Sequence, residues 1–154
     1  MAVVRILVDG YSLLHAWQDL APKEPRHSAR AREALIRVLT QYADSTGTPV
    51  TLFFDGSGGP KDVPKNISSD SLEIVFSRDS KTADDLIERT AYRLKPYGEA
   101  LAVTNDYAER DTVISMGGLA QSCEDFIKDI DRALNERDDF LKQYNRREAN
   151  RYKR

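Results

Sequence analysis

The chain has 154 residues, of which 40% are hydrophobic and 31% charged, and its formal net charge is -2. This length suits one ordinary domain that buries a hydrophobic core without needing disulfides or structural metals. Cys123 is the only cysteine and His15 and His27 are the only histidines, so an intrachain disulfide and a Cys/His zinc site are both excluded. The sequence shows no signal-peptide pattern and no apolar run near the roughly 20 residues that span a bilayer. We therefore expect a cytoplasmic protein with no membrane partner.

The first predicted element is a buried parallel strand from Val3 to Val8, an apolar and β-branched run. It ends in Asp9 and Gly10. Ligands of open α/β sheets lie outside the carboxyl ends of the strands, so Asp9 is a candidate site residue. The alternative is an Asp-Gly turn in which the side chain only bonds nearby backbone. Repetition of the pattern further along favours the first interpretation.

Residues 11–23, which include Trp17, predict an irregular segment. Ser28 is then the expected cap of a helix that packs on the sheet and ends at residues 46–49. Its apolar positions follow the spacing of one helix face. They are Ala31, Ala34, Leu35, Val38, Leu39 and Tyr42.

The second predicted strand, residues 50–54, repeats the opening design because it also ends in Asp-Gly, at Asp55. Residues 57–71 are rich in Gly, Pro, Ser and Lys and show no helix or strand period. They predict a mobile, substrate-facing loop beside the strand ends. Residues 72–76 predict the third strand.

The next helix begins with Ser80 or Thr82 as its cap, and Pro96 with Gly98 stops it. Asp84 and Glu88 are four residues apart, so they share one face of this helix while Asp85 points elsewhere. Two carboxylates at this spacing repel by a few tenths of a kcal/mol unless a cation or a base lies between them.

The fourth predicted strand runs from Leu101 to a third acid, Asp106. A short helical piece to Ile114, a turn at residues 116–118 and a long final helix complete the chain. The expected buried ridge of that helix is Phe126, Ile127, Ile130, Ala133, Leu134, Phe140, Leu141 and Tyr144.

The element order predicts a three-layer α/β fold with a mostly parallel sheet of four or five strands and helices on both faces. Acids would line its carboxyl edge. Clustered carboxylates are costly unless a cation neutralises them, and Mg²⁺ prefers carboxylates completed by waters and substrate phosphates. A site built from Asp9, Asp84 and Asp106 would suit such an ion, which can activate water against a phosphodiester.

Several short motifs, in this order and spacing, resemble the YacP-like branch of the NYN domain ribonucleases, relatives of the PIN nucleases. They are Val8-Asp9-Gly10-Tyr11, Phe54-Asp55, Thr82-Ala83-Asp84 with Ile87-Glu88, and Asn105-Asp106-Tyr107 followed by a Gly-Gly turn. The resemblance implies a PIN-like fold in a single domain over residues 1–150, with a basic end at 141–154. It also implies an Mg²⁺- or Mn²⁺-dependent endoribonuclease associated with ribosomes and mRNA cleavage.

The same resemblance implies roles for individual residues. Asp9, Asp84 and Asp106 would be metal-binding catalytic acids and Glu88 a further catalytic acid. The supporting residues would be Asp55, Ser12 and Asn105. The chain departs from the family pattern at Ser12, where Asn is usual, and at Ala120 and Gln121, where a basic residue is common after the Gly-Gly turn.

Candidates for RNA binding come from charge and aromatic character. Phosphate contacts can come from Lys81, Arg78, Lys61, Lys65 and the C-terminal bases, because such contacts are independent of sequence. Tyr11 and Tyr107 could stack on unpaired bases, and Trp17 is more typical of packing. The alternative for each aromatic residue is core packing, and for the basic end a solvated helix. Residues 141–154 hold six bases against one acid, Glu148.

The leading hypothesis is thus a metal-dependent endoribonuclease acting on single-stranded RNA, with mRNA on the ribosome as the substrate that the resemblance implies; DNA is not expected. A non-catalytic RNA- or ribosome-binding module on the same fold is the second hypothesis. The third is a metal-dependent phosphatase with an Asp nucleophile. The absence of an Asp-x-Asp pair disfavours it, because position 11 is Tyr11.

Overall fold

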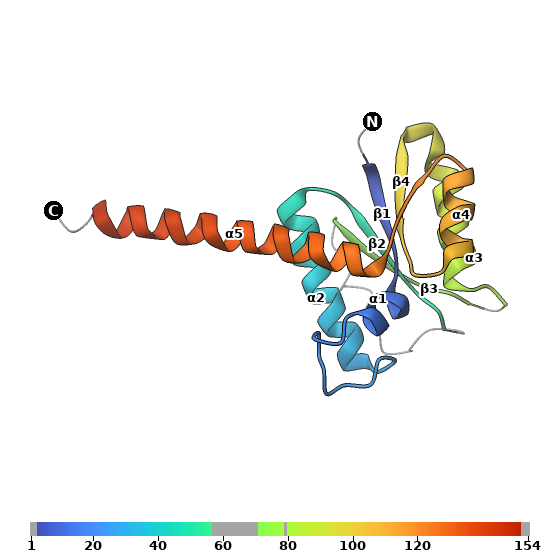
Figure 1. Cartoon of the computed structure of the whole chain (residues 1–154), viewed down its shortest axis with the longest axis horizontal. Helices are drawn as coiled ribbons and strands as arrows, with labels where there is room; N and C mark the ends of the chain where they lie inside the picture. Colours follow the sequence, from blue (N-terminus) through green and yellow to red (C-terminus); the bar gives the residue numbers. More distant parts are fainter. Residues whose placement is uncertain (1–2, 57–70, 79, 152–154) are drawn as a thin grey trace.

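The computed structural model describes residues 3–56, 71–78 and 80–151. Its centre is a five-stranded parallel sheet in the order β3-β2-β1-β4-β5 (Figure 1). The strands are β1 (Val3–Asp9), β2 (Val50–Phe54), β3 (Leu72–Phe76), β4 (Glu99–Val103) and β5 (Leu119–Gln121). Strands β1, β2 and β4 include long apolar runs because both faces of the sheet are covered by helices.

Helices pack on both faces of the sheet and make the three layers that the sequence predicts. One apolar core joins the sheet to α1 (Gly10–Ala16), α2 (Ala29–Thr46) and the first part of α5 (Cys123–Arg151). A second core lies on the other face, under α3 (Ala83–Leu94) and α4 (Tyr107–Ser115). A 3-10 turn, η2 (Lys95–Tyr97), follows α3. The predicted fold class is therefore confirmed.

The sheet reverses its winding direction between β1 and β4. The chain leaves β1 through α1 and α2 on one face to reach β2, and it returns from β3 through α3 on the other face to reach β4. The carboxyl ends of β1 and β4 therefore lie at a topological switch point, which is where ligands of doubly wound sheets bind.

The prediction of an irregular segment after β1 is wrong in its first part, because residues 10–16 form α1. The Asp9 side chain caps this helix by accepting a hydrogen bond from the Ser12 backbone N–H at 3.3 Å. Leu13 and Leu14 are fully buried in the core. Two adjacent apolar residues in a single turn are too few to show a helical period, so the sequence pattern missed the helix.

The end of β4 and the strand β5 also differ from the prediction. Strand β4 stops at Val103, and Asp106 instead caps α4. Strand β5 has three residues, too few to show an alternating pattern, and it follows the turn at Gly117 and Gly118. Gly117 has a φ of +89°, and a Cβ on Gly118 would lie 2.7 Å from a Val113 methyl carbon. Glycine is thus required at both positions for the chain to enter β5.

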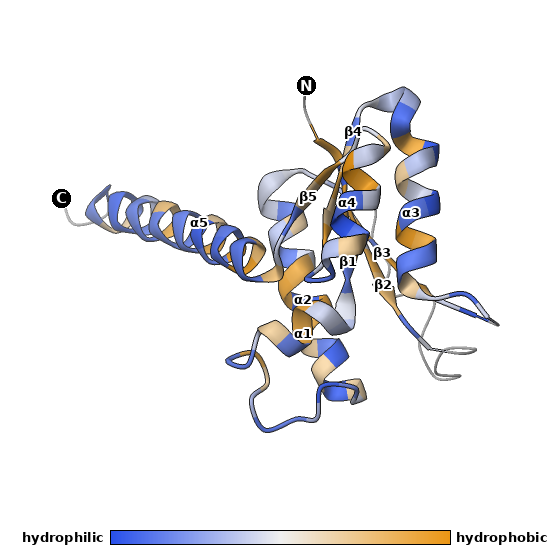
Figure 2. Cartoon of the chain, turned by 45° about the vertical axis from the view of Figure 1, so that its right-hand side comes forward, coloured by the Kyte–Doolittle hydropathy of each residue, from blue (hydrophilic) through white to orange (hydrophobic). Residues whose placement is uncertain are grey.

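The predicted buried ridge of the last helix is right only in its first half. Cys123, Phe126 and Ile130 are buried, whereas the distal apolar residues are exposed. Exposed fractions are 67% for Phe140, 43% for Leu141 and 54% for Tyr144. The reason is that α5 extends away from the sheet, and its projecting half is largely hydrophilic (Figures 1 and 2).

The predicted loop at 57–71 lies outside the described residues except for Ser71. Of the helices in the described ranges, none combines the length and the apolar character that a membrane crossing requires.

Candidate active site

Acidic side chains from four elements gather at the carboxyl edge of the sheet. Asp9 ends β1, Asp55 follows β2, Asp84 lies in the first turn of α3, and Asp106 caps α4. The charges of Asp55 and Asp84 act on Asp9, and the charge of Asp106 acts on Asp84. The structure therefore brings together the acids that the sequence placed at strand ends and at a helix start.

Asp9 is the central member of this acid cluster, because β1 lies between β2 and β4. Burial raises the pKa of Asp9 to about 6, and the charges of Asp84 and Asp55 add to the effect, while the hydrogen bond from the Ser12 backbone opposes it. The direct interaction between the Asp9 and Asp84 carboxyl groups raises the pKa of Asp9 and opposes the rise in the pKa of Asp84.

Asp84 enters the cluster because the start of α3 is tightly capped. The Thr82 side chain accepts a hydrogen bond from the Asp85 backbone N–H, and the Asp85 carboxylate accepts one from the Thr82 backbone N–H. This capping box occupies Asp85 and leaves Asp84 directed to the sheet edge, as the sequence predicts. Burial raises the pKa of Asp84, and the charge of Asp106 raises it further.

The structure adds an acid that the sequence analysis missed, Glu109 in the first turn of α4. Its side chain is only 3% exposed, and its Oε1 has no hydrogen-bond partner in the described part of the chain. Burial, together with the charges of Asp84, Glu88, Asp9 and Asp106, raises the pKa of Glu109 to about 9. The carboxyl group is therefore protonated at neutral pH in the absence of a cation.

A sequence signal for Glu109 was present but ambiguous. It stands three residues after Asp106, where a helix commonly carries an acid to complement the dipole of its first turn. Such an acid is usually exposed. Only the packing of α4 against α3 turns this one toward the interior.

The remaining predicted acids lie around Asp9, Asp84 and Glu109. The Asp106 carboxylate is exposed and accepts hydrogen bonds from the backbone N–H groups of Ala108 at 3.0 Å and Glu109 at 3.4 Å. Asp55, also exposed, accepts one from the hydroxyl of the buried Ser77 at 3.1 Å. Glu88 is half-buried, and its charge acts on Glu109.

Ser12 and Asn105 connect the elements that carry the acids. The Ser12 hydroxyl accepts a hydrogen bond from the Asn105 backbone N–H at 3.4 Å, which ties α1 to the end of β4. The Asn105 side-chain oxygen accepts one from the Cys123 backbone N–H at 2.8 Å, and its amide donates to Glu124 at 2.9 Å. Asn105 thereby holds the start of α5 close to the carboxyl end of β4.

Of the predicted RNA-binding residues, Tyr107 is 76% exposed, with the Arg110 guanidinium 4.2 Å from its ring centroid. Tyr11 is half-buried, and its ring packs against His27 at 4.2 Å and Phe54 at 5.1 Å between ring centroids. Arg78 and Lys81 are exposed in the segment that leads into α3. Lys61 and Lys65 lie outside the described residues.

The donor chemistry of the acid cluster fits a hard divalent cation. Carboxylate oxygens are the ligands that Mg²⁺ and Mn²⁺ prefer, and a buried carboxyl oxygen of Glu109 has no protein donor. Within residues 3–56, 71–78 and 80–151, no Lys or Arg forms an ion pair with these acids. The same residues contain no group of three or more His, Cys, Asp or Glu side chains arranged to hold a metal ion.

A sequence model of the YacP-like NYN domain matches residues 6–154, almost the whole chain. The chain belongs to the YacP-like NYN domain family. This membership confirms the resemblance that the motifs indicated. The NYN domain is a PIN-like nuclease domain, so the family suggests a nuclease with RNA as its substrate.

A related sequence and two solved structures agree with this assignment. The chain is 29% identical over 127 residues to a protein named "Uncharacterized protein YacP" from Bacillus subtilis (strain 168), covering 82% of this chain and 74% of that protein. A crystal structure of a tryptophan-to-leucine mutant of Rae1 (YacP) from Bacillus subtilis matches with a TM-score of 0.77 and 25% identity, over 92% of this chain and 82% of the other. The unmutated Rae1 (YacP) structure matches in fold with the same TM-score at 24% identity, over 97% and 84% of the two chains.

Proposed function

We propose that this YacP-like NYN protein is a divalent-metal-dependent endoribonuclease that cleaves single-stranded RNA, with mRNA on the ribosome as its substrate and Mg²⁺ or Mn²⁺ as its cofactor. The observation that carries the proposal is the gathering of Asp9, Asp84 and Glu109, whose pKa values are all raised by burial and by the charges of neighbouring acids. Perturbed carboxyl groups at a switch point are typical of catalytic sites.

The proposed roles follow from the surroundings of each acid. Asp9, Asp84 and Asp106 would hold the cation, and Glu88 would be a further catalytic acid. A bound divalent cation supplies a water of lowered pKa and neutralises charge on the cleaved phosphodiester. Asp55, Ser12 and Asn105 would support this arrangement through the hydrogen bonds described above.

Protonation sets a condition on this chemistry. Asp9 must be deprotonated to hold a cation, and burial opposes the loss of its proton by raising its pKa. Glu109 keeps its own proton at neutral pH and so adds no further negative charge to the acid cluster. Cation binding is therefore expected to strengthen as the pH rises through about 6.

Incubation with labelled single-stranded RNA in Mg²⁺, in Mn²⁺ and in EDTA tests the proposal directly. Internal cleavage by the wild-type chain should require the metal and should fall at least about 100-fold in Asp9→Asn and Asp84→Asn, because each change removes a charged ligand. Asp111→Asn, an exposed acid of α4, is the matched control and should cleave normally. Cleavage that persists in EDTA or in Asp9→Asn would contradict the proposal.

A non-catalytic RNA- or ribosome-binding module is the second candidate. It is favoured by one observation, the lack in the described residues of three side chains arranged around a metal position. This candidate predicts that the wild-type chain and Asp9→Asn bind RNA or ribosomes equally and that neither cleaves RNA, whether it is free or on translating ribosomes.

A further inference from the structure

The connection between α1 and α2 brings the two histidines of the chain together. His15 lies in the last turn of α1, and His27 stands just before Ser28, the cap of α2. The Nε2 atoms of this histidine pair are 3.3 Å apart, and the ring centroids are 5.3 Å apart. Since the nitrogens are much closer to each other than the ring centres are, the two Nε2 atoms face each other.

Contacts on both sides hold the histidine pair in place. The His27 ring packs against the Tyr11 ring, with 4.2 Å between the centroids. The His27 backbone carbonyl accepts a hydrogen bond from the Arg32 guanidinium at 2.8 Å, and the His15 carbonyl accepts one from the Gln18 side-chain amide at 2.8 Å. A ligand that binds both nitrogens therefore finds them already positioned, which lowers the cost of ordering them.

The direct contact between the two rings gives the free chain little stability. A hydrogen bond from one Nε2 to the other requires an acceptor nitrogen, so the two rings cannot both be protonated. Both histidines are exposed, and a hydrogen bond that water can replace adds little to the free energy of unfolding. The facing nitrogens thus suit a bound ligand better than they suit stability.

The separation of the nitrogens fits a transition-metal ion. Two imidazole nitrogens that bind one tetrahedral Zn²⁺ at about 2.0 to 2.1 Å lie about 3.3 to 3.4 Å from each other. The two Nε2 atoms are already at this separation. Imidazole suits Zn²⁺, Ni²⁺ and Cu²⁺, whereas Mg²⁺ and Mn²⁺ prefer the carboxylate oxygens of the acid cluster.

The histidine pair would provide two protein ligands to such an ion. The composition excludes a zinc site with four Cys and His ligands. In the part of the chain that the structure describes, no group of three or more His, Cys, Asp or Glu side chains is arranged to hold a metal ion. Water would therefore complete the coordination of Zn²⁺, and the ion would exchange with solvent.

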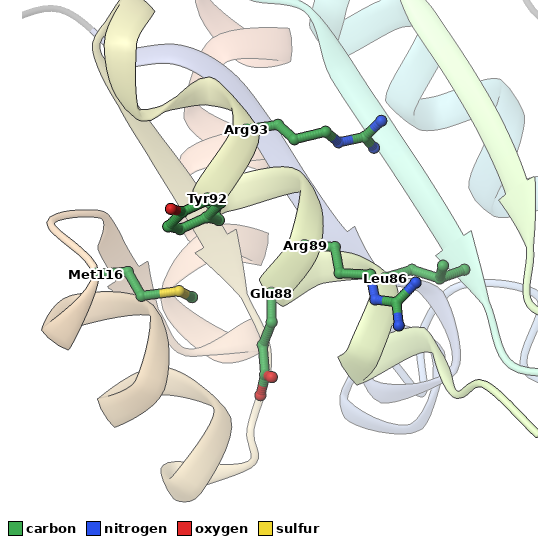
Figure 3. Close-up of a pocket in the computed structure, with 6 residues that line it drawn as sticks. All are labelled: Leu86, Glu88, Arg89, Tyr92, Arg93 and Met116. Carbon is green, nitrogen blue, oxygen red and sulfur yellow. The ribbon is translucent and has the colours of Figure 1, made fainter.

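A surface cavity of about 550 Å³ beside α3 lacks such a convergence of groups. Tyr92 lies with Met116 on one side of the helix, whereas Arg89 and Arg93 project from the opposite side (Figure 3). Its aromatic and charged groups therefore do not meet on one small ligand. In the histidine pair, by contrast, two donor atoms face one point.

We propose that His15 and His27 form a surface site for Zn²⁺, and that the bound ion ties the end of α1 to the start of α2. The two histidines are 12 residues apart in sequence, so the ion closes the segment whose carbonyl groups accept hydrogen bonds from Arg26. Closing this loop stabilises the folded chain because only the folded state holds both imidazoles at one position. The proposal does not depend on nuclease activity.

Imidazole NMR tests the site directly, because the chain has only two histidines and so gives two sets of ring signals. Zn²⁺ is added to the untagged, ¹⁵N-labelled chain in an Asp84→Asn background, which weakens the acid cluster as a competing site. The Nε2 signals of both rings should shift together and follow one binding curve. A shift of one ring alone, or of neither, would overturn the proposal.

Variants measure what each imidazole adds. His15→Gln and His27→Gln should each weaken Zn²⁺ binding at least about tenfold, the lower end of what the loss of a group around a metal costs. Asp19→Asn, an exposed acid of the same connection, is the matched control and should bind Zn²⁺ as the parent chain does. Melting temperatures in EDTA identify any variant that fails to fold, and the NMR titration needs no histidine variant.

Stability and proteolysis test the tie between α1 and α2. Zn²⁺ at ten times its Kd should raise the melting temperature of the parent chain by about 3 to 6 °C. It should also slow proteolytic cutting within residues 17–27, and both effects should be absent in the two histidine variants.

The remaining outcomes contradict the proposal. If calorimetry detects Zn²⁺ binding but neither imidazole signal moves, the ion lies elsewhere and the contact between the rings is a hydrogen bond only. If both imidazoles bind Zn²⁺ but the melting temperature and the cutting rate stay the same, the ion does not tie the helices together.

Discussion

At the scale of single residues, the unusual feature of this protein is a carboxyl group kept in the interior. Glu109 is buried on α4, and its Oε1 finds no hydrogen-bond donor among the described residues. A buried carboxyl group avoids the large cost of an uncompensated charge by retaining its proton. The free energy of unfolding should therefore depend on pH.

The pKa of Glu109 is raised from its ordinary value of 4.5 to about 9. Below pH 4.5 the group is protonated in both the folded and the unfolded chain. Between these two values the unfolded chain releases the proton and the folded chain retains it, so the free energy of unfolding falls as the pH rises. Glu109→Gln removes this dependence and should be more stable than wild type between pH 7 and 9, but equally stable near pH 4.

Thermal melts in EDTA across this range measure the effect. Glu33→Gln, an exposed acid on α2, is the control and should keep the wild-type slope. Melting curves of wild type and Glu109→Gln that stay parallel from pH 5 to 9 would contradict the assigned protonation.

A second residue-scale constraint is Gly10, directly after the central acid. A Cβ at this position would lie 2.4 Å from Cε1 of the Phe54 ring and 3.0 Å from the Phe53 carbonyl oxygen. Gly10→Ala should therefore lower the free energy of unfolding by about 1 to 3 kcal/mol through overpacking. It should also lower cleavage, because Asp9 caps the helix that begins here.

Denaturant unfolding measures this loss, and Gly56→Ala is the matched control, since a Cβ there meets nothing within 4 Å. An equal effect of the two substitutions would show that backbone freedom rather than the Phe54 contact matters at Gly10.

At the scale of elements, one arginine organises the connection between α1 and α2. The Arg26 guanidinium donates hydrogen bonds to the backbone carbonyl oxygens of Leu14, Trp17, Ala21 and Glu24. Ala21 has a φ of +47°, a left-handed conformation that is uncommon for a residue with a side chain. The Arg26 side chain thus holds the connection between α1 and α2, which has little regular structure, in one conformation.

Arg26→Ala should loosen this connection and lower the free energy of unfolding by about 1 to 3 kcal/mol, because four carbonyl groups lose a charged donor. Limited proteolysis should show faster cutting within residues 17–27, where the chain loses its tether. Arg37→Ala, an exposed arginine of α2, is the control and should resist proteolysis as wild type does. Unchanged cutting in Arg26→Ala would show that packing of Trp17 and Leu20 holds the segment instead.

At the scale of the whole molecule, the main feature is a helix that extends beyond the core it starts from. Ile130 is the last fully buried residue of α5, whereas the helix continues to Arg151 (Figure 1). Its last residues, 141–151, hold four bases and one acid, so they offer phosphate contacts away from the acid cluster. We expect this part to add RNA affinity without adding stability.

Removal of residues 143–154 tests this expectation. The melting temperature should change by less than about 4 °C, the shift that about 1 kcal/mol produces in a domain of this size. RNA affinity at low salt should fall, and its salt dependence should become weaker, because phosphate contacts are lost. Truncation after Lys128 is the contrasting control and should unfold the chain, since it removes Ile130 from the core. Unaltered RNA affinity after the shorter deletion would assign the basic end to another role.

Much of the fold and the first members of the site followed from local sequence patterns. Apolar runs that end in acids predicted β1 and β2 with Asp9 and Asp55 at their ends, because parallel strands carry their carboxyl ends to one edge. The spacing of Asp84 and Glu88 and the Thr82 cap predicted how α3 presents its acids. These features depend on residues close in sequence, so the sequence by itself determined them.

Other features depended on contacts between distant segments, and only the tertiary structure decided them. Periodicity shows which face of α5 is apolar. It does not show that α5 extends beyond the sheet, which leaves the apolar side chain of Phe140 exposed. An acid in the first turn of a helix looks the same in sequence whether it faces solvent or, like Glu109, is buried in the interior. Burial and charge at a position are set by the elements that pack around it, and that packing is a property of the whole fold.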